Sequence, residues 1–136
     1  MDLMNSLMVA ATGLRAQSSR MRVIAENIAN ANSTGLDPNQ EPYRRRIPTF
    51  EAEFDRALKS EVVKIGKIEE DKSDFRLRYQ PGHPAANEEG YVRVPNVNTL
   101  VESVDMREAQ RSYEANLNVV QSSRTMLART LDILRG

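Results

Sequence analysis

Two long segments with helical patterning, one at each end of the chain, constrain the fold more than any other feature. The first runs from about Asp2 to Asn32, and one apolar row recurs in it every seven residues: Leu7, Leu14, Met21 and Ile28. A second row, offset by three or four positions, holds Leu3, Ala10, Gln17, Ile24 and Ala31. This spacing predicts an amphipathic helix that packs along a heptad seam, interrupted once by the polar Gln17.

The second segment runs from about Thr99 to Leu134 and repeats the pattern. Its main row is Met106, Tyr113, Val120, Leu127 and Leu134, joined by Leu117 and Leu131. Pro95 blocks a helix upstream, and Thr99 with Glu102 forms a predicted capping pair at the helix start. A further apolar row lies beside the first, at Val119, Met126 and Ile133. This helix is therefore expected to face more than one partner.

The sequence between these segments is of a different kind, because all six prolines fall there. "FRLRY" alternates apolar and basic residues and predicts a strand, "VVKIGKI" and "YVRV" do so less clearly, and "QPGHP" marks a turn. "TFEAEFDRAL" is open between helix and strand. We predict a mainly α fold, with two long terminal amphipathic helices in a coiled-coil-like hairpin and a small loop-rich β segment between them. The expected boundaries are 1–36 for the N-terminal helix, 37–97 for the central segment and 98–136 for the C-terminal helix.

Three asparagines stand where the first helical pattern ends, in "AENIANANSTG". Asparagine disfavours helix interiors, because its side chain competes for backbone hydrogen bonds. Asn27 and Asn30 form a polar row beside the apolar one. Such a row can set the register between packed subunits, since an amide both donates and accepts; the alternative is that these residues are solvated. Asn32 and Gly35 are expected to end the helix, Gly35 as a left-handed stop.

Composition and charge limit the possible functions further. The chain has 136 residues, a formal net charge of zero, 5% aromatic residues and no cysteine. A neutral chain gives no support for nucleic acid or an anionic membrane as a partner. So few large rings cannot build a thick core alone, which leaves room for a partner to complete the burial. The N-terminal stretch "MDLMNSLMVAATGLRAQ" lacks a basic n-region and is too short and polar to span a bilayer, so neither a Sec signal peptide nor membrane insertion is expected.

Residues that could carry catalysis or hold a metal are few. His83, the only histidine, stands in a Pro- and Gly-rich turn, where a structural role is favoured. The carboxylates of "GKIEEDKSD" alternate with lysines, which is typical of a solvated loop rather than an acid–base pair or a calcium site. The three arginines of "YRRRIP" favour a solvated or interface edge over a nucleic-acid patch. We predict no catalytic residue, no metal and no cofactor, and hence a protein that is not an enzyme.

Both ends of the chain resemble a known family. "AENIANANSTG" closely resembles the "NIANANTTG" signature of the bacterial flagellar axial proteins, which comprise rod, hook and hook-associated proteins. The stretch Arg111–Gly136 resembles the C-terminal helix of the same group. "PYRRR" and "GYVRVPNVN", together with the short length, are most similar to subunits of the proximal rod. "GLDPNQE" and Val62–Asp74 have no clear counterpart, so the fold of the middle is left open.

The resemblance implies a structural subunit of the proximal rod of the flagellar basal body, part of the drive shaft that transmits torque. Such a protein is exported by the flagellar type III apparatus without a cleaved signal peptide. It assembles in the periplasm with other rod subunits and copies of itself in a helical array. At the base of the rod it would contact the junction with the membrane ring and the export gate.

The residues expected to pack subunits together are the seam positions and the asparagine row: Leu7, Leu14, Met21, Ile24, Asn27, Ile28, Asn30, Met106, Tyr113, Leu117, Val120, Leu127, Leu131 and Leu134. Two other classes of function compete with a rod subunit. A coiled-coil adaptor or secretion-system component outside flagella is the alternative. An enzyme is almost excluded by the residue inventory.

Overall fold

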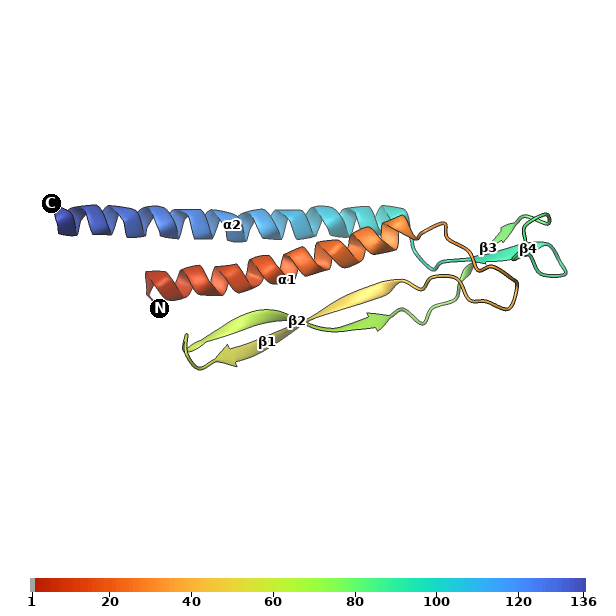
Figure 1. Ribbon diagram of the computed structural model, residues 1–136, viewed down its shortest axis with the longest axis horizontal. Coiled ribbons are helices and arrows are strands. Elements are labelled where there is room, and N and C mark those ends of the chain that lie inside the picture. The colour runs from red at the N-terminus through yellow and green to blue at the C-terminus, as the bar shows by residue number, and fades with distance from the viewer. Residues whose placement is uncertain (1) are drawn as a thin grey trace. The chain divides into compact units, whose positions relative to one another are not determined.

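The computed structural model describes residues 2–136, and its elements follow the order helix, four strands, helix (Figure 1). They are α1 (Leu3–Ala29), β1 (Arg46–Asp55), β2 (Ser60–Glu70), β3 (Arg76–Tyr79), β4 (Tyr91–Val94) and α2 (Thr99–Arg135). The strands form two separate two-stranded sheets, β1–β2 and β3–β4. The predicted order, two terminal helices with a small β segment between them, is confirmed. "TFEAEFDRAL", which was open between helix and strand, supplies most of β1 and the turn after it.

The chain divides into two compact units. Unit 1 comprises the chain up to Met21, Thr49–Lys67 and Arg107–Gly136. Unit 2 comprises Arg22–Pro48 and Ile68–Met106. Each unit draws on both helices and on the β segment, so the units cut across the predicted boundaries at 36 and 97, which stay a prediction.

Helix α1 ends at Ala29, because donors of the residues that follow it form hydrogen bonds to the last carbonyls of the helix. The Nδ2 of Asn30 donates to the carbonyl oxygen of Glu26 at 2.8 Å, and the backbone N–H of Ala31 donates to the carbonyl of Ile28 at 3.2 Å. The prediction that Gly35 is a left-handed stop is wrong, since its φ is not positive. A Cβ on Gly35 would lie 2.5 Å from the carbonyl oxygen of Gln40, so the glycine serves a close backbone approach.

Helix α2 begins where it was predicted to begin, but its cap differs. The side chain of Asn98 accepts from the backbone N–H groups of Leu100 (3.0 Å) and Val101 (3.3 Å), as an N-cap does. The predicted capping pair of Thr99 and Glu102 is therefore wrong. Glu102 is instead buried, with 1% of its surface exposed.

In unit 1, α1 and α2 run antiparallel (Figure 1). The guanidinium of Arg20 lies 3.6 Å from the carboxylate of Glu108, and Gly13 lies against Asn116. From Gly13 to Arg20 the residue number rises along α1, while the contacted residue on α2 falls from Asn116 to Glu108. A Cβ on Gly13 would lie 2.8 Å from Nδ2 of Asn116. The side chain of Asn116 therefore occupies space that a side chain at position 13 would need.

The α2 residues that are most buried in unit 1 are small. Ala109 is 0% exposed and Ser123 5% exposed, and both lie in one heptad row with Asn116. The predicted apolar row flanks this small row, and its members Tyr113 and Val120 are only half-buried. Small residues let two helix backbones come close, which leaves the larger apolar side chains at the sides of the contact.

The β1–β2 ribbon in unit 1 is held by side chains at its turn and on one face. The Oδ1 of Asp55 accepts from the backbone N–H groups of Ala57 and Leu58, and Lys59 takes a positive φ of 51° at the turn. The Nδ2 of Asn5 in α1 donates to the carbonyl of Leu58 at 3.2 Å. This contact links the turn of the ribbon to the first turns of α1.

In unit 2, β3 and β4 pair antiparallel with Arg76 opposite Val94 and Tyr79 opposite Tyr91. Val92 and Val94 are buried, whereas all four residues of β3 are exposed. Gly90 precedes β4 with a φ of 88°, which favours glycine. The strands predicted from "FRLRY" and "YVRV" are therefore confirmed. No helix within residues 2–136 combines the length and apolarity that crossing a bilayer demands.

Replacing Ala109 by Leu should destabilise the protein by about 1–3 kcal/mol, because the side chain would enter a fully buried helix–helix contact. Urea unfolding followed by far-UV circular dichroism measures the change. Ala115→Leu is the matched control, since Ala115 is exposed on the same helix; it should stay within about 0.5 kcal/mol of the parent. Equal stabilities for the two variants would show that the small row does not limit the packing.

Candidate functional site

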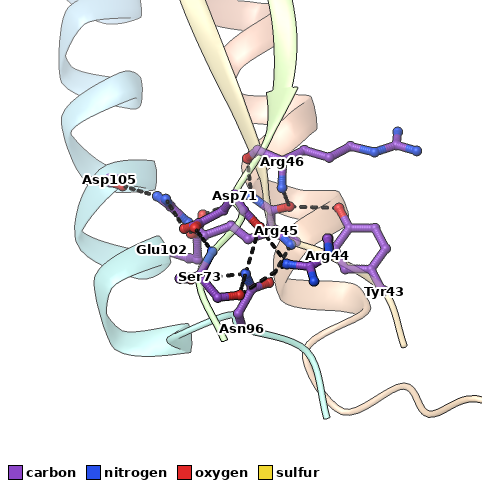
Figure 2. Close-up of polar contacts among 10 residues, drawn as sticks. Tyr43, Arg44, Arg45, Arg46, Asp71, Ser73, Asn96, Glu102 and Asp105 are labelled. Carbon is purple, nitrogen blue, oxygen red and sulfur yellow. Dashed lines mark hydrogen bonds and ion pairs between the residues drawn. The ribbon is translucent and has the colours of Figure 1, made fainter. Parts of the chain in front are cut away.

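Four segments of unit 2 meet at a cluster of polar side chains, which we call the Asn27 cluster. It contains the end of α1, the run that leads into β1, the end of β2 and the first turn of α2 (Figure 2). Its members are Asn27, Tyr43, Arg45, Arg46, Asp71 and Glu102. The three consecutive arginines, predicted to form a solvated or interface edge, thus contribute to contacts within the chain.

Asn27 lies at the centre of the cluster and is 1% exposed. Its Oδ1 accepts from the hydroxyl of Tyr43 at 2.7 Å and from the backbone N–H of Arg46 at 2.9 Å. Its Nδ2 donates to the carbonyl oxygen of Arg46 at 2.9 Å and to the carboxylate of Glu102 at 3.3 Å. The alternative that Asn27 is solvated is therefore wrong. Both the oxygen and the nitrogen of its amide bind groups of the same chain. The register role between subunits stays a prediction, and it would have to act through these contacts.

Arg45 neutralises the acidic residues around the start of α2. Its Nε donates to the carboxylate of the buried Glu102, and its other nitrogens lie 3.5 Å from Asp71 and 3.7 Å from Asp105 (Figure 2). Burial alone would lower the pKa of Arg45. The hydrogen bond to Glu102 and the charges of the three carboxylates outweigh burial and raise that pKa. A buried carboxylate is tolerated here because it has both a cation and an amide donor.

Asn96 and Ser73 fix the segment that follows β2. The Oδ1 of Asn96 accepts from the backbone N–H of Arg45 at 2.8 Å, and its Nδ2 donates to the carbonyl of Asp71 at 2.9 Å. Hydrogen bonds from Ser73 lower the pKa of Asp71, and Arg45 adds to that effect. Arg44 donates to the carbonyl oxygen of Asp71 at 3.1 Å and lies 4.2 Å from the ring centre of Phe75. These contacts extend the cluster from the ends of the two helices to the segment between β2 and β3.

Tyr43 completes the cluster on the α1 side, and burial raises the pKa of its hydroxyl. Its proton is donated to Asn27, so it is held as a hydrogen-bond donor. The acid–base groups of the cluster are thus paired with one another, which suits a structural role. Sequence reasoning did not find the pairing of Arg45 with Glu102, because no local spacing links residues this far apart.

The predicted packing residues of α1 have different environments. Ile24 and Asn27 are buried, whereas Leu7, Leu14, Met21, Ile28 and Asn30 are half-buried. The amide nitrogen of Asn30 donates a hydrogen bond to the carbonyl of Glu26, in the last turn of its own helix. The half-buried residues contact their own unit and still offer surface to a partner.

The predicted packing residues of α2 become more exposed towards its C-terminal end. Met106, Tyr113, Leu117, Val120 and Leu127 are half-buried, while Leu131 is 54% and Leu134 79% exposed. Every residue from 128 to 136 is exposed. We call Leu127, Leu131 and Leu134 the leucine stripe, because their spacing puts them on one face of the helix. The end of α2 is therefore an apolar helix face that its own chain does not cover.

Replacing Asn27 by Leu should destabilise the isolated chain by at least about 2 kcal/mol, since each buried group left without a partner costs about 1–3 kcal/mol. Leu is the better helix former, so a helix-propensity effect alone would have the opposite sign. Tyrosine fluorescence during urea unfolding reports mainly on unit 2, which contains Tyr43, Tyr79 and Tyr91. Asn32→Leu, at an exposed position near the same helix end, should change little. A stable Asn27→Leu variant would contradict the central role of this amide.

Arg45→Met should destabilise unit 2 by about 3–5 kcal/mol, because it leaves the buried Glu102 without its cation. The double variant Arg45→Met with Glu102→Leu should recover much of that loss. Arg46→Met serves as the control, because the Arg46 side chain is 49% exposed and its ion pair with Glu26 is a surface pair. If the single and double variants unfold at the same urea concentration, the charge of Glu102 is not what Arg45 stabilises.

Comparison with known proteins covers both helical ends of the chain. Residues 7–35 match the family described as flagella basal body rod protein. Residues 88–133 match the family described as flagellar basal body rod FlgEFG protein, C-terminal. The first match contains most of α1, including Asn27, and the second contains β4 and nearly all of α2.

Individual relatives match over almost their whole length. The flagellar basal-body rod protein FlgC of Agrobacterium fabrum is 50% identical, with 94% of this chain and 92% of the relative covered. FlgC of Borreliella burgdorferi is 42% identical over the full length of both chains, and FlgC of Bacillus subtilis is 40% identical over 98% of this chain and 99% of the relative. The chain therefore belongs to the FlgC family of flagellar basal-body rod proteins.

Proposed function

We propose that this structural subunit of the flagellar rod lies in the proximal rod and assembles there through the apolar faces of its two terminal helices. The observation that carries the proposal is the uncovered end of α2, where Leu131, Ile133 and Leu134 are 54–79% exposed. A helix with no packed face is marginally stable in water. Contiguous exposed apolar surface of this kind marks an interaction site.

The half-buried residues of α1 support the same proposal. Leu7 and Leu14 contact their own unit incompletely, and Met4 and Met8 are 50% and 46% exposed. A neighbouring helix could pack against these side chains in a coiled-coil-like seam. Both helices would then contribute one face to their own chain and another to the assembly.

The proposed partners are other rod subunits and further copies of this chain in a helical array. The junction with the membrane ring and the export gate is the proposed contact at the rod base. The location is the periplasmic rod, reached through the flagellar type III apparatus without a cleaved signal peptide. The family membership and the uncovered helix faces support this combination.

A coiled-coil adaptor or secretion-system component outside flagella is not favoured, because full-length relatives are named flagellar basal-body rod proteins. The proposed role is structural and not catalytic. Support comes from the Asn27 cluster, in which Arg45 pairs with Asp71 and Glu102, and Tyr43 donates its proton to Asn27. Those groups serve the fold.

Leu131→Asp should abolish incorporation of the chain into basal bodies and abolish motility, since a buried unpaired charge in a packed helix contact costs several kcal/mol. Arg129→Asp is the matched control on the opposite face of the same turn. Immunoblots of purified basal bodies and of the secreted fraction separate assembly from export, and export of both variants should be retained. Normal motility with Leu131→Asp, or equal loss with both variants, would contradict packing through the leucine stripe.

A further inference from the structure

The leucine stripe of α2 is bounded by positive charge. Arg124 lies seven residues before Leu131, and Arg135 lies four residues after it, so both project from the stripe's side of the helix. Arg129 lies on the opposite face and Asp132 off to one side. Arg124 and Arg135 are both exposed. The uncovered helix face is therefore apolar along its length and basic at its two ends.

A second exposed face, in unit 2, has the complementary character. Tyr79 stands opposite Tyr91 across the β3–β4 pair, and the rings meet edge to face with centroids 5.3 Å apart. Leu77 lies on the same side, two residues before Tyr79. Leu77 is 62%, Tyr79 66% and Tyr91 39% exposed, although the other side of β4 is buried. We call these three residues the β3–β4 face.

Acidic residues adjoin the β3–β4 face. The loop from Gln80 to Gly90 contains Glu88 and Glu89 and no lysine or arginine, and both glutamates are exposed. The one arginine on this face, Arg93, is opposite Leu77 at the other end. Its guanidinium lies 5.6 Å from the ring centre of Phe75 and donates to the carbonyl of Pro38, so it is turned towards its own unit.

The same complementarity holds for the two units as wholes. Unit 1 contains 11 basic and 8 acidic residues, a net charge of +3, and unit 2 contains 8 basic and 11 acidic residues, a net charge of −3. These totals account for all 19 basic and 19 acidic residues of the neutral chain. A neutral protein with oppositely charged units attracts its own copies when unlike units meet.

We infer that the leucine stripe of one copy docks on the β3–β4 face of a second copy, with Arg124 or Arg135 next to Glu88 and Glu89. The inference rests on the proposed function and names the partner of the uncovered helix end. Helix anchors at spacings of four and seven residues are the usual way in which a helix occupies an apolar face. Because the two surfaces differ, the contact is heterologous, and it propagates from copy to copy.

Engineered disulfides test the contact directly, because the chain has no cysteine of its own. Two differently tagged full-length chains, one with Leu134→Cys and the other with Tyr79→Cys, are produced together in a motile strain. Basal bodies are then purified, and both tags are detected in them before oxidation. A disulfide needs Cα atoms about 4.4–6.8 Å apart, so only direct neighbours react. The control pair combines Arg129→Cys with Tyr79→Cys, and a second test pair combines Leu131→Cys with Leu77→Cys.

The expected result is a disulfide between the two tags for the test pairs, with a yield about tenfold above that of the control pair. Absence of both tags from basal bodies would contradict the proposed function. Both tags present without a disulfide between them would overturn this inference alone. A disulfide formed within one chain, between two Leu134→Cys chains, or only to a different rod protein would overturn it as well.

Charge reversal tests the electrostatic part. Arg124→Glu with Arg135→Glu in the chain that donates the helix should lower the disulfide yield about tenfold. Glu88→Lys with Glu89→Lys in the acceptor chain should restore it, whereas the acceptor change alone should lower it. Exposed charges are screened by salt, so the disulfide yield from purified Leu134→Cys and Tyr79→Cys chains without charge reversals should also fall as ionic strength rises. If the combined reversal does not restore the yield, the arginines and glutamates are not neighbours.

Discussion

The amide of Asn27 makes the contacts on which the local structure of unit 2 depends. Its oxygen accepts hydrogen bonds from the Tyr43 hydroxyl and the Arg46 N–H. Its nitrogen donates to the Arg46 carbonyl and to the carboxylate of Glu102. A leucine at this position would favour the helix, yet could join none of these groups. The asparagine therefore holds the end of one helix to the start of another through the segment that enters β1. The carboxylate of Glu102 can be buried in this unit because Arg45 and Asn27 both bind it.

Local features of the sequence predicted most of the fold. Heptad rows located both helices to within a few residues, and alternation located the strands of β3 and β4. Two details were wrong, because contacts that the local spacing does not show decided them. Glu102 was assigned to a cap by its spacing, although Arg45 binds it; Asn98 occupies the cap instead. Gly35 was assigned to a left-handed stop, although the approach of the Gln40 carbonyl accounts for the glycine.

The candidate site was predictable only in part, because local patterns do not show contacts between distant residues. The family signature pointed to Asn27, but its partners lie up to 75 residues away, and a single sequence gives no sign of such a pairing. The buried row of small residues on α2 was also missed. Pattern analysis looks for large apolar residues, whereas Ala109, Asn116 and Ser123 are small or polar. The leucine stripe, by contrast, could be recognised as an apolar row from its spacing. Its exposure could not, because an exposed and a buried apolar row look identical in sequence.

The small row on α2 implies two kinds of evolutionary constraint on one helix. At Ala109 and Ser123, which are buried, substitution is limited by volume, and a modest change in polarity is of less consequence. At Leu131 and Leu134 the chain itself imposes no size limit, and any restriction has to come from whatever covers them. Positions of the first kind should therefore vary independently of the neighbouring subunits. Positions of the second kind should vary together with the surfaces they meet, so that a change in a rod partner would be recorded in the last turns of this helix.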